Sequence, residues 1–191
     1  MICLGLTRSS WDKTAKIWNR YTGVCEVTLS GHSRGVSNAV FSADDSLVLT
    51  TAEEAAKIWY SATGECTLTL PFRNLGGYLQ KSAAFSPDES SVLACCTDEV
   101  SIWDSTTGVC KQTLTGRVLE NHFSSAMYSA DGALIVTASK DPATAPQIWD
   151  SATGECVLTL SGHYDVVCFA IFFLCMSHEL LGAAFVLVRT L

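Results

Sequence analysis

The sequence predicts an all-β protein built from repeated units of four short antiparallel strands. Three observations carry this prediction. The pair Ile-Trp occurs four times, a Thr-Gly-x-Cys segment follows each pair, and a turn of the Phe-Ser-x-Asp type precedes the last three. Between these motifs lie short apolar segments such as "SLVLTTA" and "GALIVTAS", whose β-branched residues favour strands.

The repeated tryptophans set the period of the units. They are Trp18, Trp59, Trp103 and Trp149, separated by 41, 44 and 46 residues. The glycine of each Thr-Gly-x-Cys segment permits a tight hairpin turn, and the alternating stretch after it, "CTLTL" or "CVLTL", is typical of a strand with one buried face. Four strands in a period of this length indicate the blade of a β-propeller.

These segments resemble WD40 repeats. The resemblance rests on "SSWDKTAKIW", "GHSRGVSNAVFSADDSLVLTTAEEAAKIW", "SIWDSTTGVCKQTL" and "QIWDSATGECVLTLSGH", and it covers roughly residues 7 to 172. It implies three full repeats at 30–70, 71–114 and 115–160, a partial repeat at 1–29 and another at 161–172. Residues 173–191 form a divergent apolar tail.

We expect these repeats to form an open arc, as in a fragment of a longer propeller. The alternative is a small ring of four blades, in which the strand near Val166–Phe172 joins the N-terminal partial blade and closes the circle. In the tail, residues 166–188 hold two apolar runs separated by Ser177-His178-Glu179. We expect two buried strands or an aberrant C-terminus here. A single membrane helix would place Glu179 at its centre, at a cost of about 2.5–3.5 kcal/mol.

The resemblance also implies a structural hydrogen-bond network in each blade. In the WD40 family it joins the histidine of Gly-His, a Ser or Thr about ten residues before the tryptophan, an acid about six residues before it, and the tryptophan itself. The histidines and the residues at those positions, or nearest to them, are His32, His163, Arg8, Asp12, Leu49, Glu53, Asp98, Thr137 and Asp141. No repeat carries all four members, so we expect weaker and less uniform blades than the family norm.

Composition excludes several classes of function. The formal net charge is −7 and no basic run occurs, which disfavours nucleic-acid binding. Nine cysteines without a C-x-x-C pair disfavour a zinc site. The start "MICLGLTRSS" lacks the features of a signal peptide, so we expect a reducing, cytoplasmic setting. We expect the cysteines of the four Thr-Gly-x-Cys segments to be small buried residues.

The stretch Gly31-His32-Ser33-Arg34-Gly35 fits the G-x-S-x-G pattern of serine hydrolases. "TLSGH" recurs before Tyr164 without the second serine and glycine, so Gly-His is the repeated element and Ser33 is an unlikely nucleophile. The resemblance instead implies a non-enzymatic scaffold that binds a protein or peptide through the loops on the propeller face, with no cofactor or metal. The contact candidates are Arg34, Arg73, Arg117 and Tyr164. Another interpretation is the C-terminal repeat region of a larger signalling protein.

Overall fold

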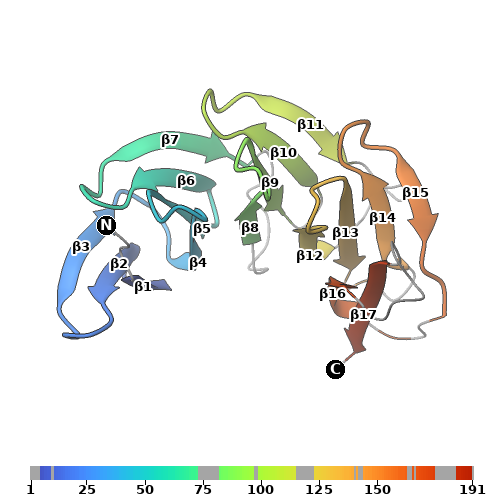
Figure 1. The fold of residues 1–191 in the computed structure, drawn as a ribbon, viewed down its shortest axis with the longest axis horizontal. Helices are drawn as coiled ribbons and strands as arrows, with labels where there is room; N and C mark the ends of the chain where they lie inside the picture. The colour runs from blue at the N-terminus through green and yellow to red at the C-terminus, as the bar shows by residue number, and fades with distance from the viewer. Residues whose placement is uncertain are drawn as a thin grey trace.

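The computed structural model describes residues 5–9, 11–72, 82–96, 99–114, 123–139, 141, 144–162, 165, 167–174 and 184–190. All elements in this part of the chain are strands, which confirms the all-β prediction. Figure 1 shows the sheets side by side in an open arc, with the two chain ends at opposite ends of the arc.

Three sheets have four antiparallel strands that follow one another in sequence order. They comprise β4 (Val36–Phe41), β5 (Leu47–Ala52), β6 (Ala55–Tyr60) and β7 (Cys66–Pro71); β8 (Ser82–Phe85), β9 (Ser91–Cys95), β10 (Val100–Asp104) and β11 (Cys110–Leu114); and β12 (Phe123–Tyr128), β13 (Leu134–Ser139), β14 (Gln147–Asp150) and β15 (Cys156–Thr159). These are the four-stranded units that the sequence predicts.

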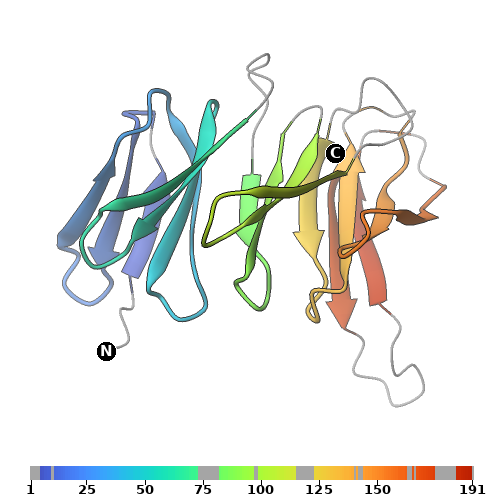
Figure 2. The same ribbon diagram turned by 90° about the horizontal axis from the view of Figure 1, so that it is seen from above.

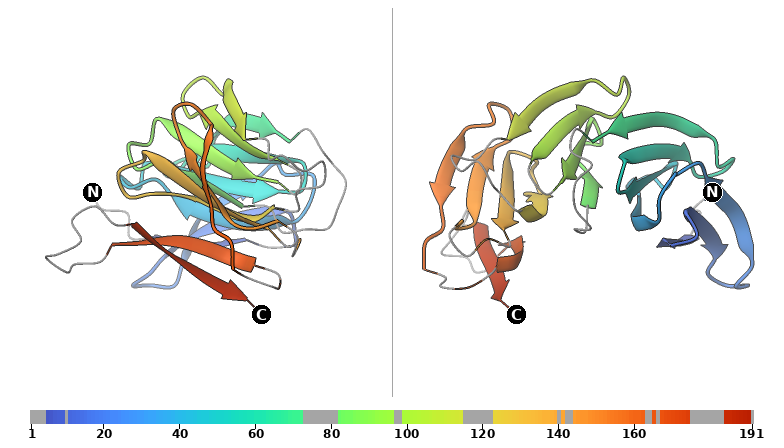
Figure 3. Two further views of the ribbon diagram at one scale, coloured as in Figure 1. Left: turned by 90° about the vertical axis from the view of Figure 1, so that its right-hand side faces the viewer. Right: turned by 180° about the vertical axis from the view of Figure 1, so that it is seen from behind.

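A smaller sheet stands at each end of the arc. The first has three strands, β1 (Gly5–Ser9), β2 (Thr14–Asn19) and β3 (Cys25–Ser30). The last is the hairpin of β16 (Val167–Leu174) and β17 (Ala184–Thr190). Figures 2 and 3 give further views of this hairpin, drawn in red next to the β12–β15 sheet.

The pairing of β16 decides between the arc and the ring. β16 pairs with β17, and β1 pairs with β2 at the far end of the arc. The ring alternative, in which residues near Val166–Phe172 join the first sheet, is therefore wrong for this structure. The apolar tail contains strands in its described part; that both strands are buried stays a prediction.

The hydrophobic core lies between neighbouring sheets. The two residues of an Ile-Trp pair contribute to the cores on opposite faces of their sheet. Successive residues of a strand point to opposite faces. Ile58 packs with Val92 and Trp103 of the following sheet, whereas Trp59 packs with Ile17 and Leu29 of the preceding one. Each buried side chain of this size stabilises the fold by about 1.5–3 kcal/mol.

The last two strands of the first four sheets are joined by the same hairpin. Its glycine, at position 23, 64, 108 or 154, has a φ of 69° to 73°, a backbone conformation that glycine adopts without strain. A bulge follows, because the register shifts between the isoleucine and the tryptophan in all four hairpins.

The hairpin cysteines correct one expectation. Cys66 and Cys156 are exposed, and Cys25 and Cys110 are only partly buried. Their position at the bulge explains the difference, since each Sγ lies 3.4–3.7 Å from the carbonyl oxygen two residues further on.

The turns between first and second strands also repeat. Ser42 Oγ donates to Asp44 Oδ1 at 2.7 Å and accepts from the Leu47 amide at 2.9 Å. Ser86 and Ser129 make the same pair of bonds in the next two sheets. The Ser-x-Asp motif therefore fixes the turn through its side chains, as its composition predicts.

Candidate functional site

The candidate site is the loop of residues 31–35 between β3 and β4, together with the turns beside it. Gly31 lies against the indole of Trp59, where a β-carbon would be 3.3 Å from the ring. Its φ is 144°, so glycine meets both the steric and the backbone requirement at this point.

A chain of buried hydrogen bonds anchors this loop. Trp59 Nε1–H donates to Thr50 Oγ1 at 2.7 Å, and the Thr50 hydroxyl lies 2.7 Å from His32 Nε2. His32 Nδ1 lies 3.1 Å from Glu54 Oε1. Because the Glu54 carboxylate can only accept, His32 Nδ1–H donates to it, and in a neutral ring Nε2 then accepts from the Thr50 hydroxyl.

This arrangement fits a neutral imidazole. Burial lowers the pKa of His32 from its ordinary value of 6.5, and this outweighs the Glu54 carboxylate, which raises it. For Glu54, burial opposes ionisation, but the backbone N–H groups of Glu54 and Ser33 and the His32 ring hold the pKa of the carboxyl below its usual value. The site therefore contains a carboxylate and an uncharged histidine near neutral pH.

Glu54 also fixes the loop backbone. Its Oε1 accepts the Ser33 amide at 2.8 Å as well as the His32 ring. Its Oε2 is buried and has no hydrogen-bond partner within the described residues. One carboxylate thus holds two consecutive residues of the loop, directly before Arg34.

In the β4–β7 sheet, the two network residues predicted from sequence spacing each lie one position before the residues that contact His32. The sequence spacing selects Leu49 and Glu53, whereas the structure places Thr50 and Glu54 at His32. The turn between β5 and β6 holds only two residues, which shortens the distance from the acid to the tryptophan. The expectation that no repeat carries all four members is therefore wrong for this sheet.

The strand register identifies the residues at the Thr50 position in the other sheets. Thr50 pairs with the residue two before its tryptophan. The residues with the same pairing are Arg8, Ala94 and Thr137. A hydroxyl thus stands at this position in two sheets of the four.

The tryptophan hydrogen bonds follow this distribution. Trp149 Nε1–H donates to Thr137 Oγ1 at 2.9 Å. The Nε1 atoms of Trp18 and Trp103 are buried and have no partner among the described residues. The network is therefore complete at Trp59, partial at Trp149 and missing its acceptor at the other two.

The expected turn acids bind locally. Asp12 Oδ1 accepts from the Thr14 amide and hydroxyl, at 3.0 and 2.6 Å. Asp141 Oδ2 accepts from the Thr144 hydroxyl at 2.9 Å. Asp98 and His163 lie outside the described residues. The described acids thus shape the turns that carry them.

The loop and the turn beside it present two large exposed side chains. Arg34 is exposed, and Trp11, in the turn between β1 and β2, is 92% exposed. Gly35 lies beside Trp11, because a β-carbon there would be 3.1 Å from the indole Cε3 atom. The sequence argument missed Trp11, although it is the one tryptophan outside an Ile-Trp pair. The other contact candidates, Arg73, Arg117 and Tyr164, lie outside the described residues.

The serine-hydrolase geometry is not assembled at Ser33. Both ring nitrogens of His32 are engaged with Glu54 and Thr50. The segment after Ser33 is the strand β4, where a nucleophile elbow requires a helix.

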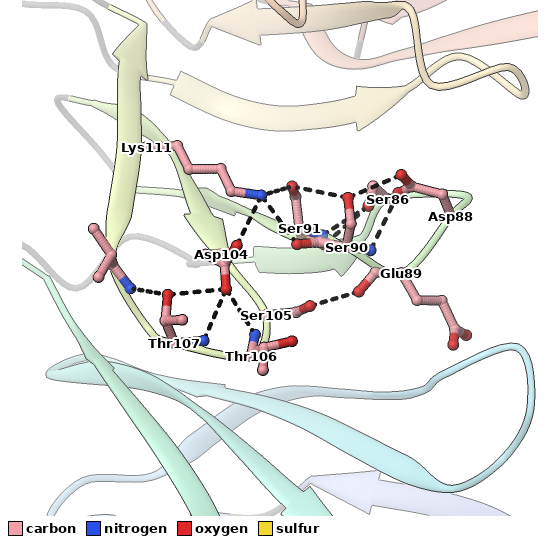
Figure 4. Close-up of polar contacts among 11 residues, drawn as sticks. Ser86, Asp88, Glu89, Ser90, Ser91, Asp104, Ser105, Thr106, Thr107 and Lys111 are labelled. Carbon is pink, nitrogen blue, oxygen red and sulfur yellow. Dashed lines mark hydrogen bonds and ion pairs between the residues drawn. The ribbon is translucent and has the colours of Figure 1, made fainter.

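The opposite rim of the arc is a set of polar turns, shown for the third sheet in Figure 4. Asp104 Oδ1 accepts the Thr106 and Thr107 amides at 3.1 and 2.8 Å, and Oδ2 lies 3.1 Å from Lys111 Nζ. The Thr107 amide, Lys111 and the Thr107 hydroxyl hold the pKa of Asp104 well below its usual range. Ser105 Oγ ties this turn to the Glu89 carbonyl at 2.6 Å.

The described residues hold neither a metal-ligand cluster nor a membrane-spanning helix. No group of three or more His, Cys, Asp or Glu side chains is placed to hold a metal ion there. No helix in the part of the chain that the structure describes is long and apolar enough to span a membrane.

Comparison with known proteins identifies the repeated unit. Residues 23–60 match the family model of the WD domain, G-beta repeat, and this segment runs from the first hairpin to the end of β6. No curated protein matches the chain. The matched segment contains the His32–Thr50–Trp59 connection, and its strand pattern recurs in the two sheets that follow. Residues 23–60 are therefore similar to a WD repeat, and the sheets that follow repeat its strand pattern.

Proposed function

We propose that this chain is a non-enzymatic scaffold module that binds a protein or peptide partner through the loop of residues 31–35 and the neighbouring turn. The observation that carries the proposal is the exposed Trp11 beside the rigidly held Arg34 loop. WD-repeat sheets are typical of protein-interaction modules, and this step is an analogy from the family.

The physical argument concerns pre-organisation. Exposed tryptophan and arginine are the side chains that contribute most at protein interfaces. The hydrogen bonds from Glu54 fix the backbone beside Arg34, so a partner meets a loop that is already ordered. The formal net charge of −7 favours a partner with a basic surface around this contact.

The proposal includes a cytoplasmic setting. Cys66 and Cys156 are exposed free thiols. Exposed thiols of this kind stay unpaired in a reducing compartment.

The test compares three variants by quantitative proximity labelling or affinity enrichment with mass spectrometry. Trp11→Ala and Arg34→Ala should each reduce enrichment of the same specific partners. Tyr60→Ala is the matched control. Tyr60 is also an exposed aromatic residue, but it lies at the last position of β6, where the β6–β7 hairpin begins. The proposed contact surface would be contradicted if Trp11→Ala and Arg34→Ala both retain the specific partners and Tyr60→Ala loses them.

A further inference from the structure

The four hairpins that follow the Ile-Trp pairs share one backbone shape but differ in the sign of their charge. Their glycines all have a φ between 69° and 73°. Residues 19–24 carry the single charge of Arg20, which gives this turn a formal charge of +1. Residues 60–65 and 104–109 each carry −1, and residues 150–155 carry −2. The β2–β3 hairpin is therefore the basic one of the four.

Asn19 keeps the shape of this turn without a carboxylate. Its Oδ1 accepts two backbone N–H groups of the turn, at 3.0 Å each. Asp104 and Asp150 cap their own hairpins with the same two bonds. An amide oxygen thus replaces a carboxylate oxygen, so the turn retains its hydrogen bonds and has no negative charge beside Arg20.

The side chains of Arg20 and Tyr21 contact each other at the tip of this hairpin. Arg20 Cζ lies 4.8 Å from the centroid of the Tyr21 ring, which is within the range of a cation–π contact. Arg20 Nη2 also donates to Tyr21 Oη at 2.8 Å. Both residues are exposed, and Tyr21 is 75% exposed. The two contacts therefore order an exposed cation and an exposed ring as one unit.

The exposure of Tyr21 belongs to its place in the turn. The residues at the same place in the next three hairpins are Ala62, Thr106 and Ala152, and all three are exposed within four-stranded sheets. None of them is aromatic, so the turn itself does not require a ring here. Tyr21 is a large side chain at a position that the fold leaves open to solvent.

The Arg20–Tyr21 pair offers hydrogen-bond donors. Because Tyr21 Oη accepts from Arg20, its own O–H is available to donate, and the guanidinium has further N–H groups and no acceptor. Arg20 makes no ion pair within the described residues. Glu26, on the adjoining strand, accepts from Asn19 Nδ2 at 2.9 Å. The pair therefore suits a ligand group that only accepts hydrogen bonds.

We propose that Arg20 and Tyr21 form a docking site for an acidic segment of a partner protein, with one Asp or Glu carboxylate of the partner bound by both side chains. The planar guanidinium matches the two oxygens of a carboxylate. Arginine and tyrosine are among the side chains that contribute most at protein interfaces. Val24, which is 59% exposed in the same turn, adds apolar contact area.

The charge of the whole chain favours a carboxylate over a phosphate at this site. The formal net charge is −7, so a doubly charged group is repelled more strongly than a singly charged one. The site is also separate from the surface around Trp11. That residue lies in the turn before β2, whereas the hairpin follows β2, so the two surfaces are at opposite ends of this strand.

Fluorescence anisotropy at low ionic strength tests the proposal. The probe is a labelled peptide with four consecutive glutamates in a Gly-Ser frame, and the same peptide with glutamines is its uncharged counterpart. The wild-type chain should bind the glutamate peptide and not the glutamine peptide. Arg20→Ser should weaken binding by about tenfold or more, because it removes the charged donor. Serine stands at this place in the other three hairpins, so the turn accepts it.

Two further variants separate the site from the general effect of charge. Tyr21→Ala should also weaken binding, and alanine stands at the same place in two of the other hairpins. Lys13→Asn is the matched control. It removes one exposed positive charge at the other end of β2, and asparagine tolerates the φ of 70° there. This control should change binding by less than about twofold.

Three results would overturn the proposal. The first is a wild-type chain that does not bind the glutamate peptide. The second is equal weakening by Arg20→Ser and Lys13→Asn, with unchanged circular dichroism spectra, which would show that only net charge matters. The third is displacement of the probe by inorganic phosphate at a lower concentration than by acetate, which would assign the site to a phosphate group instead.

Discussion

The indole nitrogen of Trp59 donates a hydrogen bond to Thr50 Oγ1 at 2.7 Å, and both side chains are buried. The Thr50 hydroxyl is also hydrogen-bonded to His32, whose other ring nitrogen contacts Glu54. A strand tryptophan and a surface loop are thereby coupled through one hydroxyl.

Thr50→Val should lower the free energy of unfolding by about 2–4 kcal/mol, because it leaves the Trp59 N–H and the His32 Nε2 buried without partners. Chemical denaturation followed by tryptophan fluorescence measures the change. Thr28→Val, at an exposed position in β3, is the control and should cost less than about 0.5 kcal/mol. Equal losses in the two variants would contradict the role assigned to Thr50.

The third sheet offers the reverse experiment. Trp103 Nε1 is buried without a partner among the described residues, and Ala94 stands at the position that Thr50 holds in its sheet. Ala94→Ser should raise the free energy of unfolding by about 1 kcal/mol, because the new hydroxyl accepts the indole proton. Serine is preferred to threonine here, since Ala94 is fully buried and a larger side chain would strain the core.

Thr137→Ala is the matched variant for that experiment. It removes the acceptor of Trp149 Nε1–H in the fourth sheet and should destabilise the protein by about 1–3 kcal/mol. If Ala94→Ser lowers stability while Thr137→Ala leaves it unchanged, the unpaired indole is not the weak point of the third sheet.

The sheets could be predicted from the sequence, whereas several side-chain positions within them could not. The Ile-Trp pairs and the turn motifs predict the sheets, because strand alternation sends the two side chains into two different cores. The network register at Glu54 could not be obtained by counting, because it depends on a turn of two residues. The exposure of Cys66 likewise could not be predicted, because it depends on a bulge that the residue types in the hairpin do not indicate. Trp11 was missed because it lies outside the repeated motif.

The hairpin after Trp59 contains a local defect that mutation can repair. Asp104 and Asp150 begin their hairpins and accept two backbone N–H groups each, at 2.8–3.1 Å. Tyr60 holds the equivalent position after Trp59 and cannot accept these bonds through a carboxylate. Tyr60→Asp should raise the melting temperature, with a gain in stability of about 0.5–1 kcal/mol.

Asp150→Ala provides the opposite change for that hairpin and should lower the melting temperature. Differential scanning calorimetry of the two variants and of Tyr60→Ala separates the carboxylate from the loss of the aromatic ring. A melting temperature for Tyr60→Asp no higher than that of Tyr60→Ala would show that the carboxylate adds nothing to this turn.

The buried histidine makes stability depend on pH near neutrality. Burial lowers the pKa of His32 below its ordinary value of 6.5, so the unfolded chain binds the proton more readily than the folded one. The stabilising contribution is complete above pH 6.5 and is lost as the pH falls through the lower folded value. Glu54 opposes this loss and Lys57 adds to it, as the two charged groups that act on the ring.

Urea denaturation between about pH 7.5 and 5.5 should show a declining free energy of unfolding, and His32→Gln should show a smaller decline. An NMR titration of the His32 ring proton, assigned by its absence in the variant, should give a pKa below that of the urea-unfolded chain; stability that rises as the pH falls would show that the Glu54 carboxylate dominates instead.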